Sequence, residues 1–74
     1  IILKVYYKQM RDKIKKALQS KYEGEIAEAQ VNVDVFLDHP VGVGEHPDII
    51  ESIDSQMHRI AEAEDKLLVL DKYF

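Results

Sequence analysis

The middle of the chain contains the residues best suited to metal chemistry. An acid-His-Pro pattern occurs twice there, as Asp38-His39-Pro40 and as Glu45-His46-Pro47, and Asp48 follows the second copy. Imidazole nitrogens and carboxylate oxygens are ligands for zinc and other divalent metals. The spacing fits no metal motif, however, and helix ends followed by turns explain the same residues. We predict no metal site, and metal binding by His39 and His46 stays open as the alternative.

Other constellations that could carry chemistry are incomplete. Gly42-Val43-Gly44 lacks the longer glycine fingerprint and the following lysine of a phosphate loop. The glutamates of both arms lack the Glu-x-x-His pairs of di-metal helical bundles. The chain has no cysteine, and no serine stands in a nucleophile–base arrangement. We therefore predict that the protein is not an enzyme and that it needs no cofactor.

The positions of the prolines and glycines in the sequence predict an all-α hairpin. Both prolines and two of the three glycines fall within residues 38–48, and long proline-free stretches flank them. A residue before proline is pushed out of the α region, so the first helix must end near Asp38. Asp48 and Glu51 fit a capping box at the start of the second. We predict one domain over residues 1–74, with a helix at about 5–37, a loop at 38–47 and a helix at 48–73.

Apolar side chains of the first arm recur at the α-helical period. They are Tyr7, Met10, Ile14, Leu18, Tyr22, Ile26, Ala29, Val33 and Phe36. This spacing of about 3.6 residues predicts one apolar stripe along a helix. Gly24 interrupts the stripe and is either tolerated or marks a kink or a close helix approach. Residues 1–7 are rich in β-branched and aromatic side chains, so a short strand between subunits is the alternative to helix there.

The second arm carries a heptad repeat that favours a coiled-coil-like crossing. Ile53, Ile60, Leu67 and Phe74 recur every seven residues, and Ile49, Ile50, Met57, Ala63 and Leu70 widen the stripe. Folding the arms about Val43 pairs residues whose numbers add up to about 86. This register places apolar residues opposite each other, Met57 against Ala29 among them. It also predicts ion pairs of Asp71 with Lys15 and Lys16, and of Glu64 and Asp65 with Lys21.

The same register leaves the start of the first arm without a partner. An unpaired apolar cluster on a small protein usually marks an interface. We predict that it is formed by Ile2, Val5, Tyr6, Tyr7, Met10 and Ile14. A homodimer of hairpins, as a four-helix bundle or a coiled-coil-like assembly, would cover both stripes and the surplus. The predicted function is therefore self-association together with binding of another, unidentified protein.

Charge is distributed unevenly along the chain. Residues 1–22 carry seven cations and one acid, and residues 23–74 carry three cations and thirteen acids, within a net charge of −4. A basic amphipathic segment could bind nucleic acid or an anionic surface, which is the alternative function. The acidic total argues against nucleic acid. No apolar run reaches the roughly 20 residues needed to span a bilayer.

Two stretches resemble proteins of known origin. Pro40-Val41-Gly42-Val43-Gly44-Glu45-His46-Pro47-Asp48 and Ile60-Ala61-Glu62-Ala63-Glu64-Asp65-Lys66-Leu67 are similar to segments of small uncharacterised proteins of tailed marine phages related to the T-even group. The resemblance covers about residues 20–74. It implies a phage accessory protein that works in a bacterial host cytoplasm, and it brings no activity, cofactor or catalytic residue.

Overall fold

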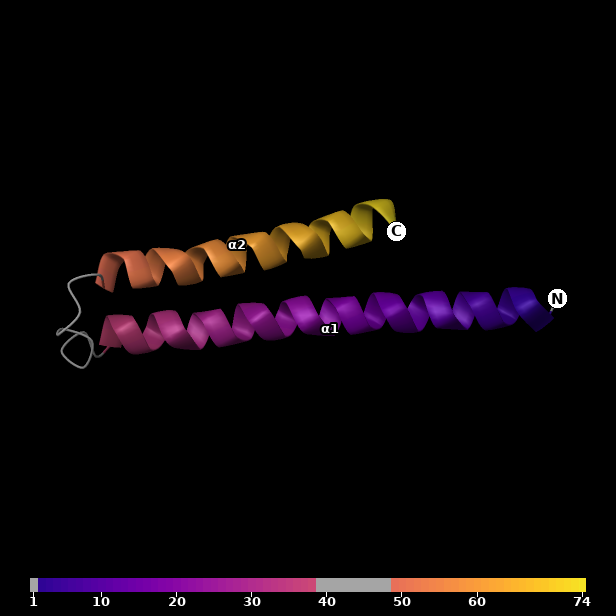
Figure 1. Cartoon of the computed structure of the whole chain (residues 1–74), viewed down its shortest axis with the longest axis horizontal. Coiled ribbons are helices and arrows are strands. Elements are labelled where there is room, and N and C mark those ends of the chain that lie inside the picture. Colours follow the sequence, from indigo (N-terminus) through magenta and orange to yellow (C-terminus); the bar gives the residue numbers. More distant parts are fainter. Residues whose placement is uncertain (1, 39–48) are drawn as a thin grey trace.

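The computed structural model of the chain describes residues 2–38 and 49–74. It contains two antiparallel helices, α1 (Ile2–Asp38) and α2 (Ile49–Tyr73), which lie side by side in a rod of 62 × 18 × 14 Å (Figure 1). The prediction of an all-α helical hairpin is therefore confirmed. Neither helix, over the residues described, is long and apolar enough to cross a membrane. The two acid-His-Pro patterns fall, apart from Asp38, outside the described residues.

Helix α1 begins at Ile2, earlier than the predicted start at about residue 5. The alternative of a strand at the N-terminus is thus wrong for residues 2–7. A lone strand would leave its backbone N–H and C=O groups unpaired, whereas each residue added to an existing helix gains a hydrogen bond. With 37 residues, α1 is about 55 Å long, against about 37 Å for the 25 residues of α2.

We call the layer of side chains between the two helices the seam. On α1 it is marked by partly or fully buried residues at steps of three and four: Lys15, Leu18, Tyr22, Glu25, Ala29, Asn32 and Phe36, with Ile26 and Val33 beside them. Such steps are the heptad spacing of coiled coils. The predicted apolar stripe is therefore right from Leu18 to Phe36, but Tyr7, Met10 and Ile14 stay exposed.

Two alanines hold the helices close together. Ala29 and Ala63 are 0% and 1% exposed, and Leu70 is the third buried residue among those described. No large side chain of the described part of the chain is fully buried. A seam built on small residues lets two helices approach closely, but it removes little apolar surface from water. The hairpin alone therefore has a thin core.

The seam of α2 differs from the predicted one by one residue in its first half. Seven-residue steps back from Leu70 and Ala63 lead to Gln56 and Ile49, which are partly buried. Met57 and Ile50 were predicted to face α1 but are 51% and 75% exposed. In place of Met57, Gln56 enters the seam, and its Oε1 accepts a hydrogen bond of 3.0 Å from Asn32 Nδ2. This polar pair makes the seam less apolar than the sequence suggested.

Three contacts across the seam fix the register. Residue 32 bonds to residue 56, residue 28 forms an ion pair with residue 59 at 3.5 Å, and Tyr22 lies under the Lys66 ammonium. The numbers of each pair add up to 87 or 88, close to the predicted 86. The predicted ion pairs of Lys15, Lys16 and Lys21 with acids of α2 are wrong, since no such pair occurs between the described residues.

Gly24 lies in an uninterrupted helix, and a Cβ built on it meets no atom within 4 Å. It therefore causes neither a kink nor a close approach within the hairpin. Because glycine in a helix interior costs backbone entropy, Gly24→Ala is expected to stabilise the protein by about 0.5–1 kcal/mol. Thermal unfolding followed by circular dichroism measures the effect. An unchanged or lower melting temperature would show that another molecule packs against this position.

Candidate protein-binding surface

Helix α1 extends beyond the end of α2, and we call residues 2–10 the overhang (Figure 1). The six residues predicted for a protein interface all lie in the overhang or within one turn of it. All six are exposed, from 86% for Ile2 to 42% for Met10. The structure thus brings them together on one helical segment that α2 does not cover. Leu3 is exposed there as well and belongs to the same surface.

Spacing separates the overhang into an apolar side and a basic side. Leu3, Tyr7, Met10 and Ile14 follow steps of four, three and four, so they share one side of the helix. Lys4, Lys8 and Arg11 follow the same steps one residue later and lead into Lys15 of the seam. Within the apolar part, the rings of Tyr6 and Tyr7 meet edge to face at 5.7 Å. The overhang is therefore a basic amphipathic helix with an aromatic centre.

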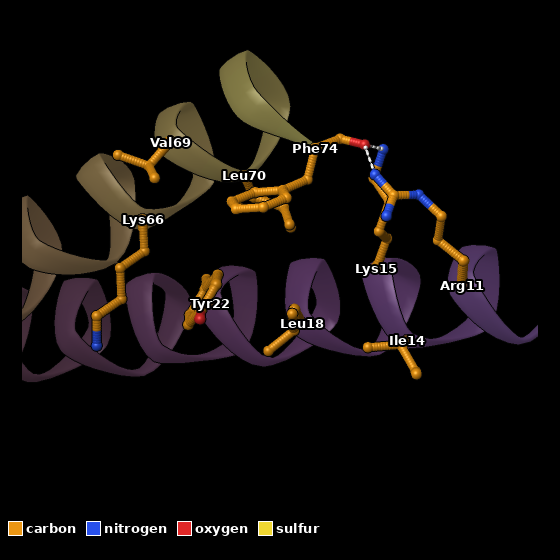
Figure 2. A pocket seen from close by; sticks show the side chains of 9 residues that line it. All are labelled: Arg11, Ile14, Lys15, Leu18, Tyr22, Lys66, Val69, Leu70 and Phe74. Carbon is orange, nitrogen blue, oxygen red and sulfur yellow. Dashed lines mark hydrogen bonds between the residues drawn. The ribbon is translucent and has the colours of Figure 1, made fainter.

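A groove of about 420 Å³ opens between the helices where α2 ends (Figure 2). Its lining is apolar in the middle and basic at the edges, and it consists of Arg11, Ile14, Lys15, Leu18, Tyr22, Lys66, Val69, Leu70 and Phe74. Leu70 and the Phe74 ring reach from α2 toward Leu18 of α1. Since Ile14 belongs both to the groove and to the apolar side of α1, the groove continues the apolar surface of the overhang.

Two cations of α1 hold the end of α2. Arg11 Nη2 and Lys15 Nζ each donate a hydrogen bond of 2.8 Å to the backbone carbonyl oxygen of Phe74 (Figure 2). The last four carbonyl groups of a helix accept no hydrogen bond from within the helix, and they carry its negative partial charge. Cations placed there donate hydrogen bonds to these carbonyl groups and balance the negative partial charge. These two positive charges lie beside Ile14 at the end of the groove nearest the overhang.

Lys66 closes the other end of the groove. Its Nζ lies 3.1 Å from Glu62 Oε1 and 5.6 Å from the centre of the Tyr22 ring. The hydrogen bond from Lys66, and then its positive charge, lower the pKa of Glu62, and the same hydrogen bond raises the pKa of Lys66. His58 also contacts Glu62, at 3.5 Å. This pairing orients the lysine across the seam.

Replacing Lys66 by glutamine is expected to bring the pKa of Glu62 back toward its usual range. A carboxyl whose pKa is lowered in the folded state stabilises that state above its unfolded pKa, and this contribution is lost as pH falls through the folded value. The variant should therefore lose less stability on acidification than the parent. Carboxyl chemical shifts and helicity recorded from neutral to acidic pH measure both effects. Lys72→Gln, with the same charge change on α2, is the matched control and should leave Glu62 unaffected.

The described residues hold no cluster of metal-ligating side chains. They contain no group of three or more His, Cys, Asp or Glu side chains that could hold a metal ion. His58 is on the exposed surface of α2 beside Glu62. The histidines of the acid-His-Pro patterns, His39 and His46, lie outside the described residues, so the alternative of metal binding stays a prediction.

Comparisons of the chain with known protein families, with curated proteins and with solved structures gave no match. The overhang and the groove must therefore be interpreted from their own chemistry. They form one exposed surface, apolar in its middle and basic along one edge, and this composition suits a helix of another chain better than a small polar substrate.

Proposed function

We propose that this chain is a small non-enzymatic interaction protein that associates with itself and, through the same kind of helix packing, with another protein. The observation that carries the proposal is the apolar surface made by the overhang and the groove, which nothing in the hairpin covers. Large contiguous apolar patches on small proteins mark interaction surfaces. The setting implied by the resemblance, an accessory protein of a phage in a bacterial cytoplasm, is part of the proposal.

The total surface supports an associated state. The hairpin exposes 6230 Å², whereas a compact monomer of 8.6 kDa exposes roughly 4,700 Å². The excess of about 1,500 Å² is larger than the roughly 800 Å² per partner that a standard protein interface covers. A chain of this size with a thin core also gains from oligomerisation the buried area that it lacks.

Mass measurement in solution tests the proposal. Sedimentation equilibrium or light scattering over a range on the order of 1–50 µM should give a mass that rises toward at least twice that of one chain at the highest concentration. The fraction of monomer should rise on dilution, and the melting temperature should fall with it, because association stabilises the folded state by mass action. A monomer throughout this range would refute self-association.

The second candidate function is binding to nucleic acid or another anionic surface. It is favoured by the basic side of the overhang, where Lys4 and Lys8 lie beyond the end of α2 in line with Arg11. Such binding weakens steeply with salt, with a slope of about −0.9 per phosphate contacted on double-stranded DNA. Retardation of DNA or RNA that is lost in Lys4→Gln/Lys8→Gln would support it. No retardation at low salt would exclude it.

A further inference from the structure

We infer that the groove, together with the apolar side of α1 that leads into it, binds an acidic amphipathic helix of another protein. This inference rests on the proposed binding of a protein partner and specifies the chemistry of that partner. The partner's helix would lie beside α1 and α2 as a third helix, with its apolar side on the groove and its acidic residues beside the cations of α1. Such a helix and a second copy of this chain would compete for the same apolar side.

The shape of the surface suits a helix. Ile14 of α1 and Val69 of α2 line the groove from opposite sides, and they are 55% and 41% exposed (Figure 2). From Tyr7 to Tyr22, the apolar residues of α1 on this side extend over about 22 Å along the helix. That length is about four helical turns, whereas a small molecule would fill the groove alone. Apolar residues on the flank of a two-helix seam are what a third helix packs against.

Five cations of α1 border this apolar side: Lys4, Lys8, Arg11, Lys15 and Lys21. The first four follow steps of four, three and four along the edge nearest α2, and the fifth stands seven residues after Ile14 in the apolar row itself. None of the five forms an ion pair with an acid of the described residues. At the inner end of the groove, Lys66 shares its charge with Glu62. The unneutralised positive charge therefore lies along α1.

The nearest acids lie on other sides of the two helices. Asp12, the one acid among residues 2–22, stands two residues before Ile14 and five after Tyr7, and both spacings place it across the helix. Asp71 likewise stands two residues after Val69 on α2. An acidic helix laid on the apolar side thus meets cations along α1. A basic helix would meet like charges there, which costs affinity and sets the choice of partner.

The apolar residues favour a helix over a nucleic acid. Contacts with phosphate groups need only the cations. Tyr7, Met10 and Ile14 are 63%, 42% and 55% exposed in the hairpin, and a phosphate backbone offers them no apolar surface. Packing against the apolar side of another helix removes them from water, which is favourable. An acidic amphipathic helix uses both the cations and the apolar row.

Designed peptides test the inference with the full chain. Each is a helical peptide of about 18 residues, or roughly five turns, with leucine at heptad spacing along one side. One peptide carries glutamate at the flanking positions, and the other carries lysine there. Fluorescence anisotropy of the labelled peptides, titrated with the chain at low salt, should show that the glutamate peptide binds at least about tenfold more tightly. A glutamate peptide of the same composition with scrambled leucines should bind at least about tenfold more weakly.

Two variants of the chain locate the bound peptide. Ile14→Gln removes an apolar residue of the groove and should weaken binding of the glutamate peptide about tenfold. Lys4→Gln/Lys21→Gln removes two of the bordering cations and should weaken it about threefold or more. Neither change enters the buried seam, since all three residues are exposed.

The controls make equal chemical changes on other sides of the helices. Leu68→Gln removes a leucine that is 69% exposed and does not line the groove. Lys16→Gln/Lys72→Gln removes two exposed cations that do not line it either. Both control variants should bind the glutamate peptide within about twofold of the parent.

The outcomes separate the inference from the proposed self-association. Equal binding of the glutamate and lysine peptides, or equal weakening by the variants and their controls, would overturn the inference. Binding of duplex DNA that depends on Lys4 and Lys21 but not on Ile14, without binding of the glutamate peptide, would assign the surface to nucleic acid and also overturn it. If the chain self-associates by mass but does not bind the glutamate peptide, the inference fails and self-association stands. If a chain that is monomeric by mass binds the glutamate peptide as expected, the inference stands and self-association fails.

Discussion

Ala63→Glu is expected to abolish the folded hairpin at 25 °C. Ala63 is 1% exposed at a close approach of the two helices, so any larger side chain forces them apart. Overpacking of a tight site costs about 1–3 kcal/mol, and an unpaired buried carboxylate adds to that. A chain of this length with a thin core has only a few kcal/mol of stability in total, roughly 3–5 kcal/mol. The expected result is therefore loss of most of the helical signal in far-ultraviolet circular dichroism.

A matched control lies two residues away on the same helix. Ala61 is exposed, so Ala61→Glu makes the same chemical change without entering the seam. Its helicity and melting temperature should stay close to those of the parent, because surface substitutions are usually within about 0.5 kcal/mol. On α1, Ala29→Glu and Ala27→Glu form the equivalent pair. Equal stability of Ala63→Glu and Ala61→Glu would show that the alanine seam does not hold the helices together.

Tyr7→Glu/Met10→Glu is expected to dissociate the self-associated state. Both residues lie on the apolar side of the overhang, and Tyr7 is 63% exposed in the hairpin. Aromatic and large apolar anchors at an interface are often worth about 2 kcal/mol or more each, and a dimer contains each of them twice. The dissociation constant should therefore rise at least about 100-fold. Sedimentation or light scattering across a dilution series measures the change.

The control for this pair has the same change in charge on the other side of α1. Gln9 and Ser20 are exposed and stand eleven residues apart, about three turns, so they share one side of the helix. Gln9→Glu/Ser20→Glu should leave the dissociation constant within a few fold of that of the parent. If both double variants weaken association equally, net charge and not the apolar side of the overhang would be responsible.

Much of the fold could be predicted from the sequence, because proline and heptad spacing act locally. The position of the hairpin and the register, within two residues, follow from Pro40, Pro47 and the apolar spacing. The rotation of α2 about its own axis does not follow from the sequence, because Gln56 and Met57 are neighbours and either one could face α1 in the same register. Their assignment depends on which one meets Asn32 across the seam, where Gln56 Oε1 accepts hydrogen bonds from both Asn32 and Arg59. Hydrophobicity alone favours Met57 in the seam, and the prediction based on it was wrong.

Of the candidate site, the overhang could be predicted from the sequence and the groove could not, for a related reason. The overhang follows from the difference in arm lengths, which can be counted in the sequence. The groove depends on where α2 ends in space and on the contacts of Arg11 and Lys15 with a backbone carbonyl. A backbone acceptor leaves no mark in the sequence. Lys15 was therefore predicted to pair with Asp71, which was wrong, and the hydrogen bond from Arg11 was not predicted.

The amide pair in the seam also locks the alignment of the two helices. If α2 slid by one heptad along α1, Asn32 Nδ2 and Gln56 Oε1 would separate, and the Asn32 amide would lose its partner inside the seam. A seam of apolar residues alone would resist such a slide less, because one apolar side chain can replace another. A single polar pair can therefore fix the register of a coiled coil even where it adds little to stability.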